Sequence, residues 1–294
     1  MRTVAAIGIF DGVHIGHKKI IKTIVRLARK SGSRSVVITF DPHPLKVLNP
    51  RKPVPLIMST SHRVRLIRDL GVDDCYVIRF NKKFSFLDPE AFVKKTLMGK
   101  FNVSDVCVGD NFVFGKGNAG NVVLLRRLGE AYGFKVKAVS LAKVSGKTVS
   151  STLVRNLIIN GKLKEASRLL GRPIAIFGTV IGGLERGRSL GYPTANINPH
   201  HEAIPPSGIY AVWINLRGRK YGGALFIGHR PTFGEKEPVV EVHIFNFNAQ
   251  IYGEDIEVTF VKRLRGVRKF SDKQKLIKQI GNDDIMARKI LGLK

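Results

Sequence analysis

The chain has 294 residues, of which 44% are hydrophobic and 24% are charged. This length predicts about two domains that can each bury a core, and the composition excludes a chain that is disordered throughout. With 50 Lys and Arg against 22 Asp and Glu, the formal net charge is +28, which attracts polyanions. The basic residues are spread from Arg2 to Lys294. We therefore expect a field that draws in small anionic ligands, and a dedicated nucleic-acid site is not expected.

Cysteine content and hydropathy indicate the compartment. Cys75 and Cys107 each lie in a short apolar run typical of a strand, so we expect two buried free thiols and no disulfide. The first apolar run is short and ends at Phe10-Asp11-Gly12, unlike a secretory signal. No run approaches the roughly 20 apolar residues that a membrane span needs. The prediction is a cytoplasmic protein with no membrane partner.

Two histidines stand where the first predicted strand (residues 4–10) gives way to the first predicted helix (residues 18–30). The first N–H groups of a helix have no partner within it and carry partial positive charge, so phosphate oxygens are stabilised there. His14 and His17 would add hydrogen bonds to a triphosphate. Gly12 and Gly16 would allow the backbone to approach the phosphates closely.

Three interpretations of this His-x-Gly-His pattern compete. It resembles the nucleotidylyltransferase superfamily, whose members transfer a nucleotide monophosphate from ATP or CTP and release pyrophosphate. It also spells the His-Ile-Gly-His of class I aminoacyl-tRNA synthetases, and the two histidines could be ordinary loop residues. Residues 57–61 resemble the second synthetase signature without either of its lysines. That absence and the short chain count against a synthetase.

The first half of the chain alternates predicted strands and helices. Strands are expected at residues 4–10, 35–40, 74–80, 103–109 and 134–141, and helices at 18–30, 61–70, 88–97 and 122–132, with another ending near 159. This alternation predicts a doubly wound parallel sheet. Ligands of such sheets bind beyond the carboxyl ends of the strands, where His14, Asp41 and Gly109 all fall.

Hydroxyl side chains open the last of these helices. Ser150, Ser151 and Thr152 are ordinary helix caps in most proteins. With Arg155 one turn further on, the same stretch offers hydroxyls, N–H groups and a guanidinium to a phosphate.

Four motifs in order resemble the FAD synthetase module of bacterial bifunctional riboflavin kinase/FAD synthetases. They are Phe-Asp-Gly-Val-His-Ile-Gly-His at 10–17, Thr-Phe-Asp-Pro-His-Pro at 39–44, Val-Gly-Asp-Asn-Phe-Val-Phe-Gly at 108–115 and Ser-Ser-Thr-Leu-Val-Arg at 150–155. The resemblance implies that catalysis uses His14, His17 and Arg155. It also implies that the nucleotide is bound by Gly12, Asp41, Asn111, Ser151 and Thr152.

Beyond a helix expected at 163–170, which stops at Gly171-Arg172-Pro173, the pattern changes. Short strand-forming runs follow at 174–181, 208–216, 221–227, 239–247 and 255–261, separated by Gly, Asn and Pro turns. They predict a small antiparallel β-barrel, and residues 271–291 predict one or two C-terminal helices packed on it. We expect one domain over residues 1–172 and a second over 173–294.

A glycine-rich loop is the chemical centre of the second half. Its glycines are Gly182, Gly183, Gly187 and Gly191. They lead to Thr194 and Asn196, whose oxygens could cradle phosphates and coordinate Mg²⁺, although the loop alone could equally be a turn. Residues 191–196 resemble the G-x-P-T-A-N signature of riboflavin kinases. Residues 240–244 resemble the family strand that carries the catalytic glutamate, which would make Glu241 the base for the riboflavin 5′-hydroxyl.

These resemblances imply a bifunctional enzyme with ATP as co-substrate and Mg²⁺ as cofactor. The second domain would phosphorylate riboflavin to FMN, and the first would transfer AMP from a second ATP to FMN, giving FAD and pyrophosphate. The sequence departs from the family pattern at Phe226, Asn246 and Val267, near the expected kinase site, and at Val113 in the first half. An enzyme with an impaired kinase therefore stays open beside full bifunctionality. An RNA-binding protein that keeps the fold is the alternative from another class.

Overall fold

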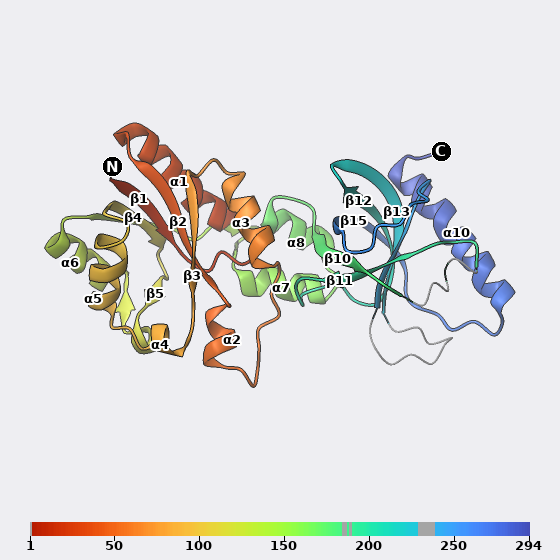
Figure 1. The fold of residues 1–294 in the computed structure, drawn as a ribbon, viewed down its shortest axis with the longest axis horizontal. Helices are drawn as coiled ribbons and strands as arrows, with labels where there is room; N and C mark the ends of the chain where they lie inside the picture. Colours follow the sequence, from red (N-terminus) through yellow and green to blue (C-terminus); the bar gives the residue numbers. More distant parts are fainter. Residues whose placement is uncertain (1, 184–186, 188–189, 229–238) are drawn as a thin grey trace. The chain divides into compact units, whose positions relative to one another are not determined.

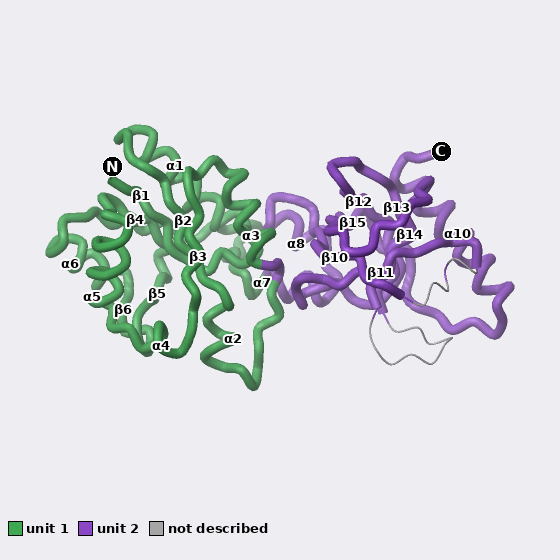
Figure 2. Tube along the Cα trace, viewed as in Figure 1, with its two compact units in different colours: residues 1–56, 60–153 green, residues 57–59, 154–294 purple. Residues whose placement is uncertain are grey.

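The computed structural model describes all residues except 1, 184–186, 188–189 and 229–238 (Figure 1). Contacts within the chain divide it into two compact units, one of residues 1–56 and 60–153 and one of residues 57–59 and 154–294 (Figure 2). Helix α8 (Leu163–Leu170), which precedes the boundary expected after residue 172, groups with the second unit. The position of that domain boundary stays a prediction.

The first unit is built on a five-stranded sheet of order β3-β2-β1-β4-β7, in which every neighbouring pair runs parallel. Its strands are β1 (Thr3–Ile7), β2 (Arg34–Asp41), β3 (Asp74–Arg79), β4 (Val103–Gly109) and β7 (Lys135–Val139). Parallel neighbours need long crossover connections, usually helical. Those connections contain α1 (Ile15–Ser31), α3 (Thr60–Arg68), α5 (Pro89–Phe92), the π-helix η1 (Val93–Met98) and α6 (Val122–Tyr132). The expected doubly wound parallel sheet is confirmed.

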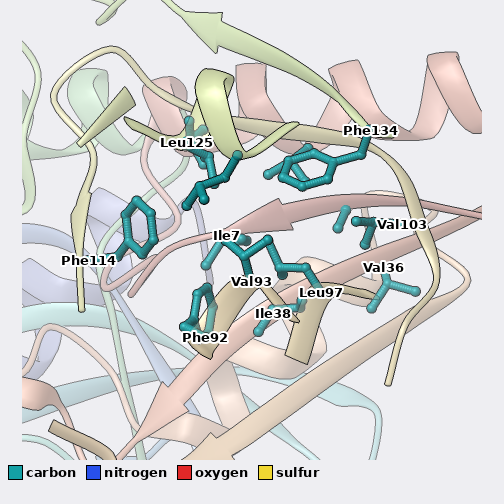
Figure 3. Close-up of a cluster of buried hydrophobic side chains, with 14 of the residues drawn as sticks. Ile7, Val36, Ile38, Phe92, Val93, Leu97, Val103, Phe114, Leu125 and Phe134 are labelled. Atoms are coloured by element: carbon teal, nitrogen blue, oxygen red, sulfur yellow. The ribbon is translucent and has the colours of Figure 1, made fainter. Parts of the chain in front are cut away.

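Helices cover both faces of this sheet. Ile7 and Ile38 share one buried cluster with Val93 of η1 and Leu125 of α6 (Figure 3). Successive side chains of a strand point to opposite faces, so Ala6 points away from this cluster. Helix α1 packs on the other face, against β1, β2 and β4. Because both faces are covered, the central strand β1 is buried along its whole length.

The second unit contains a closed antiparallel barrel of order β10-β11-β14-β13-β12-β15. Its strands are β10 (Ala175–Ile181), β11 (Ala195–Pro199), β12 (Gly208–Leu216), β13 (Arg219–Gly228), β14 (Val239–Ile244) and β15 (Asp255–Arg265). A single C-terminal helix, α10 (Lys273–Leu291), packs against β12, β13 and β15. The barrel and the helix are as expected, whereas β11 was not predicted.

Short elements complete the part of the chain that the structure describes. They are α2 (Pro44–Leu48), α4 (Lys82–Ser85), η2 (Lys116–Asn118), α7 (Ser151–Ile159) and the strand pairs β5 (Val113–Phe114) with β6 (Gly120–Asn121) and β8 (Lys143–Val144) with β9 (Lys147–Thr148). Within the described residues, no helix combines the length and the apolar character needed to cross a membrane.

Local signals set the ends of the longer helices. The Asn121 side chain accepts a hydrogen bond from the Leu124 N–H at the start of α6, and Gly133 ends that helix with φ 78°. At the start of α10, Asp272 accepts from the Lys275 N–H, and Gly292 ends the helix with φ 68°. These are the side-chain caps and left-handed glycine stops that satisfy the free backbone groups of helix ends.

Candidate active sites

The two histidines of the first motif form one unit at the start of α1. His14 is the residue before the helix, and its Nδ1 accepts a hydrogen bond from the His17 N–H at 3.3 Å. The two rings stack with centroids 3.5 Å apart and an interplanar angle of 20°. A Cβ on Gly16 would lie 3.2 Å from the His14 ring, which is tighter than most such contacts, so the glycine gives this ring room. The predicted pairing of the two histidines at the helix N-terminus is thus present.

The turn before α1 fixes these rings and joins them to a distant segment. Phe10 and Val13 have φ of 54° and 39°, and Gly12 has φ of 86°. Non-glycine residues seldom adopt the left-handed region, and such strain clusters at functional sites. The Asp11 carbonyl accepts a hydrogen bond from Ser151 Oγ at 2.8 Å. The hydroxyl at the start of α7 therefore lies beside the histidine turn, as the family resemblance implies.

The environment of His17 favours a neutral imidazole. Burial, the neighbouring His14 and the positive charge of Arg63 together hold the pKa of His17 well below its usual value of 6.5. The residue as a whole is partly exposed, but its Nδ1 is buried and has no hydrogen-bond partner among the residues that the structure describes. A neutral imidazole can still donate one hydrogen bond to a phosphate oxygen.

Arg63 is a residue of this site that the sequence did not single out. It is 1% exposed on α3, and its Nη2 donates to the Phe40 carbonyl at 2.7 Å and to Thr60 Oγ1 at 3.2 Å. Thr60 Oγ1 in turn donates to Asp41 Oδ1 at 2.6 Å. Desolvation lowers the pKa of Arg63, and the charges of Asp11 and Asp41 oppose that shift. Nothing in the sequence distinguishes this arginine from the others.

The remaining predicted residues of the first motif set lie at the strand ends and along α7. Asn111 lies in the turn after β4, where a Cβ on Gly109 would come within 3.1 Å of its Oδ1. Thr152 is exposed, and Arg155 is 8% exposed one turn along α7. His14, Asp41 and Asn111 thus follow the carboxyl ends of the adjacent strands β1, β2 and β4.

The barrel holds a cavity of about 180 Å³. Gly187, Thr194, Phe226 and Glu241 are among the residues that line it. Asn196 lies directly opposite Glu241 in the pairing of β11 with β14, and Phe226 lies opposite Glu241 on the other side, in β13. Residues directly opposite in antiparallel strands share one face of the sheet. Thr194 and Glu241 therefore line one cavity, and Asn196 shares a face of the sheet with Glu241 although it is not among the residues that line the cavity.

Two glycines make room for these polar side chains. A Cβ on Gly183 would come within 1.8 Å of Asn196 Nδ2, and one on Gly187 would lie 2.8 Å from Thr194 Oγ1. Gly191 has φ of 84° and marks the turn before Thr194. Gly183 and Gly187 therefore form a glycine cradle, because the absence of a side chain at each leaves the space that Asn196 and Thr194 occupy.

The departures from the family pattern fall at distinct places. Phe226 and Val267 both line the cavity. Asn246 lies beyond the end of β14 with φ of 54°, and its Oδ1 accepts from Arg288 Nη2 at 3.4 Å. Asn246 is not among the residues that line the cavity. Two of the three changes thus alter the wall of the site itself.

A buried ion pair joins the barrel to its helix at the cavity wall. Arg265, at the end of β15, donates to both carboxylate oxygens of Asp283 on α10. Nε donates to Oδ1 at 2.9 Å, and Nη2 donates to Oδ2 at 2.6 Å. Gln279 also donates to Asp283, at 3.0 Å. The arginine and aspartate side chains are 14% and 7% exposed. Planar bidentate pairing of this kind fixes orientation as well as charge.

Both cysteines are free and buried, as expected. Burial raises the pKa of Cys75 to about 11 and that of Cys107 to about 12. Thiols with such pKa values are protonated and unreactive at neutral pH, so they take no part in the chemistry.

Comparisons with known proteins agree along the whole chain. The FAD synthetase family matches residues 1–153 and the riboflavin kinase family matches residues 170–291. A bifunctional riboflavin kinase/FMN adenylyltransferase of Buchnera aphidicola subsp. Schizaphis graminum is 38% identical over 292 residues, which cover 98% of this chain and 94% of the relative. That of Bacillus subtilis is 37% identical over 289 residues, or 96% of this chain and 90% of the relative. A solved structure described as a macrolide-efflux protein from Streptococcus pneumoniae is similar in fold, with a TM-score of 0.83 and 30% identity over 98% of this chain and 94% of its own.

The parallel sheet with its histidine turn and the barrel with its glycine cradle define a two-domain, ATP-dependent transferase. The N-terminal domain is an FAD synthetase domain and the C-terminal domain is a riboflavin kinase domain. The chain belongs to the bifunctional riboflavin kinase/FMN adenylyltransferase family and has both riboflavin kinase activity and FMN adenylyltransferase activity.

Proposed function

We propose that His14, His17, Ser151, Thr152 and Arg155 carry out the adenylyl transfer. An oxygen of the FMN phosphate attacks the α-phosphorus of ATP, the bond from that phosphorus to the bridging oxygen breaks, and pyrophosphate leaves. The attacking phosphate is already a competent nucleophile, so alignment and stabilisation of the leaving charge are what the protein contributes. The stacked histidines at the N-terminus of α1 are the observation that carries this assignment.

Within that site each group has a separate task. Gly12, Asp41 and Asn111 bind the nucleotide at the strand ends. The neutral His17 donates to a phosphate oxygen, His14 is held against it by stacking, and the Ser151 hydroxyl is held at the same turn by the Asp11 carbonyl. Arg155 adds a fixed positive charge for the leaving phosphates.

We propose that Glu241 is the general base of the kinase reaction. The riboflavin 5′-oxygen attacks the γ-phosphorus of ATP, Glu241 takes the hydroxyl proton, and the bond to ADP breaks. Positioned bases contribute about 10²–10⁴ in rate. Gly187, Gly191, Thr194 and Asn196 would hold the phosphates. The facing positions of Asn196 and Glu241 are the observation that supports this assignment, because the asparagine belongs to the segment proposed to bind the phosphates.

The residues around this loop fit Mg²⁺. Its protein donors would be the Thr194 hydroxyl and the Asn196 amide oxygen, which lie beside Gly187 and Gly183. These are hard oxygen ligands, and Mg²⁺ typically combines one or two protein ligands with phosphate oxygens and water. The ion would supply positive charge that offsets the negative charge of the ATP phosphates.

The experiment that tests this proposal supplies the purified chain with ATP, Mg²⁺ and either riboflavin or FMN, and separates the flavins by chromatography. We expect FMN and FAD from riboflavin, and FAD from FMN. The same reactions with excess EDTA should stop riboflavin phosphorylation. If FAD forms when FMN is supplied but no product forms when riboflavin is supplied, the kinase is impaired at Phe226 and Val267. If neither reaction gives a product, the site assignments are contradicted. Cytoplasmic location and the lack of a dedicated nucleic-acid site stay predictions.

A further inference from the structure

His243 lies two residues beyond Glu241 on the same face of β14 and also lines the cavity. Its Nδ1 lies 2.7 Å from the carbonyl oxygen of Pro193. A carbonyl oxygen only accepts hydrogen bonds, so Nδ1 carries a proton and donates it. Pro193 directly precedes Thr194. This bond therefore anchors the peptide that positions the threonine hydroxyl.

The other ring nitrogen of His243 faces helix α10. Nε2 lies 3.9 Å from Asp284 Oδ1, and the two side chains are each 17% exposed. Asp284 Oδ2 accepts from Arg288 Nε at 3.0 Å. Asp284 Oδ1 is buried and has no hydrogen-bond partner among the described residues. The carboxylate is thus held by the arginine with one oxygen directed at the imidazole.

Aromatic rings hold the His243 ring from two further sides. Tyr192 and Phe245 both pack on it, with ring centroids 5.6 and 5.7 Å away and interplanar angles of 81° and 61°. Arg288 lies over the Phe245 ring, 4.3 Å from its centroid. The imidazole therefore has one orientation, determined by packing and by a hydrogen bond.

We propose that His243 is a positioning residue of the phosphoryl-transfer site: Nδ1 holds the Pro193 carbonyl so that Thr194 meets the phosphates, and Asp284 of α10 lies against the Nε2 side of the ring. This inference rests on the proposed role of Thr194. It makes α10 part of the support of the phosphate-binding loop, through Asp284, His243 and Pro193. Misplacing a positioning contact by about 1 Å can cost about 10²-fold in rate.

Two conservative substitutions separate the contacts of the ring. In His243→Asn the side-chain amide nitrogen is placed near Nδ1 and can still donate to Pro193, whereas in His243→Gln it is placed near Nε2 and cannot. We expect kcat for riboflavin phosphorylation to stay within about threefold of wild type in His243→Asn and to fall at least about tenfold in His243→Gln and His243→Ala. The KM for riboflavin should change little. FAD formation from FMN by the same preparation is the control for folding.

Binding provides a readout that does not depend on turnover. Isothermal titration with ADP and Mg²⁺ should show weaker binding to His243→Ala and His243→Gln than to wild type, with His243→Asn close to wild type. If His243 were purely structural, its substitutions would lower thermal stability, and the Asn and Gln variants would have similar kcat values. Equal kcat values for the Asn and Gln variants, or an unaffected Ala variant, would overturn the inference.

Thr194→Val distinguishes this inference from the function on which it rests. If Thr194→Val loses phosphorylation while His243→Ala keeps it, the positioning role is wrong and the role of Thr194 stands. If Thr194→Val phosphorylates riboflavin normally, both assignments are wrong.

Discussion

Asn196 and Glu241 face each other across the ladder between β11 and β14. The asparagine belongs to the proposed phosphate-binding segment and the glutamate to a strand much later in the chain, so barrel closure is what brings them together. Phe226 pairs with Glu241 from the other side. The proposed base therefore has a polar neighbour on one strand and an aromatic neighbour on the next.

Replacing Glu241 tests the proposed base. Glu241→Gln keeps the shape of the side chain and removes its capacity to take a proton, so kcat for riboflavin phosphorylation should fall by about 10²–10⁴. Steady-state kinetics with riboflavin and ATP measure this. FAD formation from FMN should be unchanged, and a kinase rate within threefold of wild type would exclude Glu241 as the base.

The glycine cradle can be tested with two neighbouring glycines. A Cβ on Gly183 would overlap the Asn196 amide, whereas one on Gly182 meets nothing within 4 Å. Gly183→Ala should therefore displace Asn196 and reduce the kinase kcat at least about tenfold, and Gly182→Ala should leave it near wild type. Equal effects of the two substitutions would mean that backbone freedom, not space for Asn196, is what the loop requires.

His17→Ala should abolish FAD formation while FMN formation continues. The substitution removes from the N-terminus of α1 the stacked ring and the N–H group proposed to donate a hydrogen bond to a phosphate oxygen. The barrel depends on neither group. Chromatography of flavins formed from riboflavin checks both steps in one sample, with FMN accumulating as the only product. Unchanged FAD synthesis would remove the central assignment of the first domain.

His17 should also make stability depend on pH. Its folded-state pKa lies below the unfolded value of about 6.5, so between these two pKa values the unfolded chain binds a proton that the folded chain does not. The free energy of unfolding should therefore fall as the pH drops below about 6.5, and His17 should contribute no pH dependence above it.

Denaturant unfolding of wild type and His17→Asn at pH 7.5 and 5.5 measures this effect. The asparagine variant should lose less stability between the two pH values than wild type does. An equal or larger loss would show that His17 is not held neutral.

The buried pair of Arg265 and Asp283 should be costly to break from one side. Arg265→Met leaves a nearly buried carboxylate without its main partner, and losses of about 3–5 kcal/mol in the free energy of unfolding are typical of such changes. Removing both charges in Arg265→Met/Asp283→Leu should recover much of that loss. Calorimetry of the single and double variants is the measurement. If the loss in the double variant equals the sum of the losses in the two single variants, the two side chains are not coupled.

The elements that sequence predicted best are those with strong local patterns. Val103–Gly109, Val122–Tyr132 and Gly208–Leu216 lie where their patterns placed them. β11 was missed because Ala195–Pro199 contains two asparagines and a proline, residues depleted in strands. It forms a strand because both of its edges pair within the barrel, with β10 and β14. Tertiary pairing overrides local preference there.

The same distinction applies to the sites. The positions of His14, His17, Thr194 and Glu241 could be anticipated, because each belongs to a short sequence motif at a helix start, a turn or a strand. The bond from Arg63 to the Phe40 carbonyl could not, because it joins a helix to a strand end and leaves no local pattern. Long-range contacts between ordinary residue types are visible only once the fold is known.

The hydrogen bond from Ser151 Oγ to the Asp11 carbonyl spans 140 positions of the sequence. Closing so long a loop is entropically costly and slow compared with local contacts. During synthesis the histidine turn emerges from the ribosome early, but it has to wait for the start of α7 before its hydroxyl neighbour arrives. A nascent chain that stops short of residue 151 therefore lacks this hydroxyl of the proposed adenylyl-transfer site, however well its earlier strands have paired.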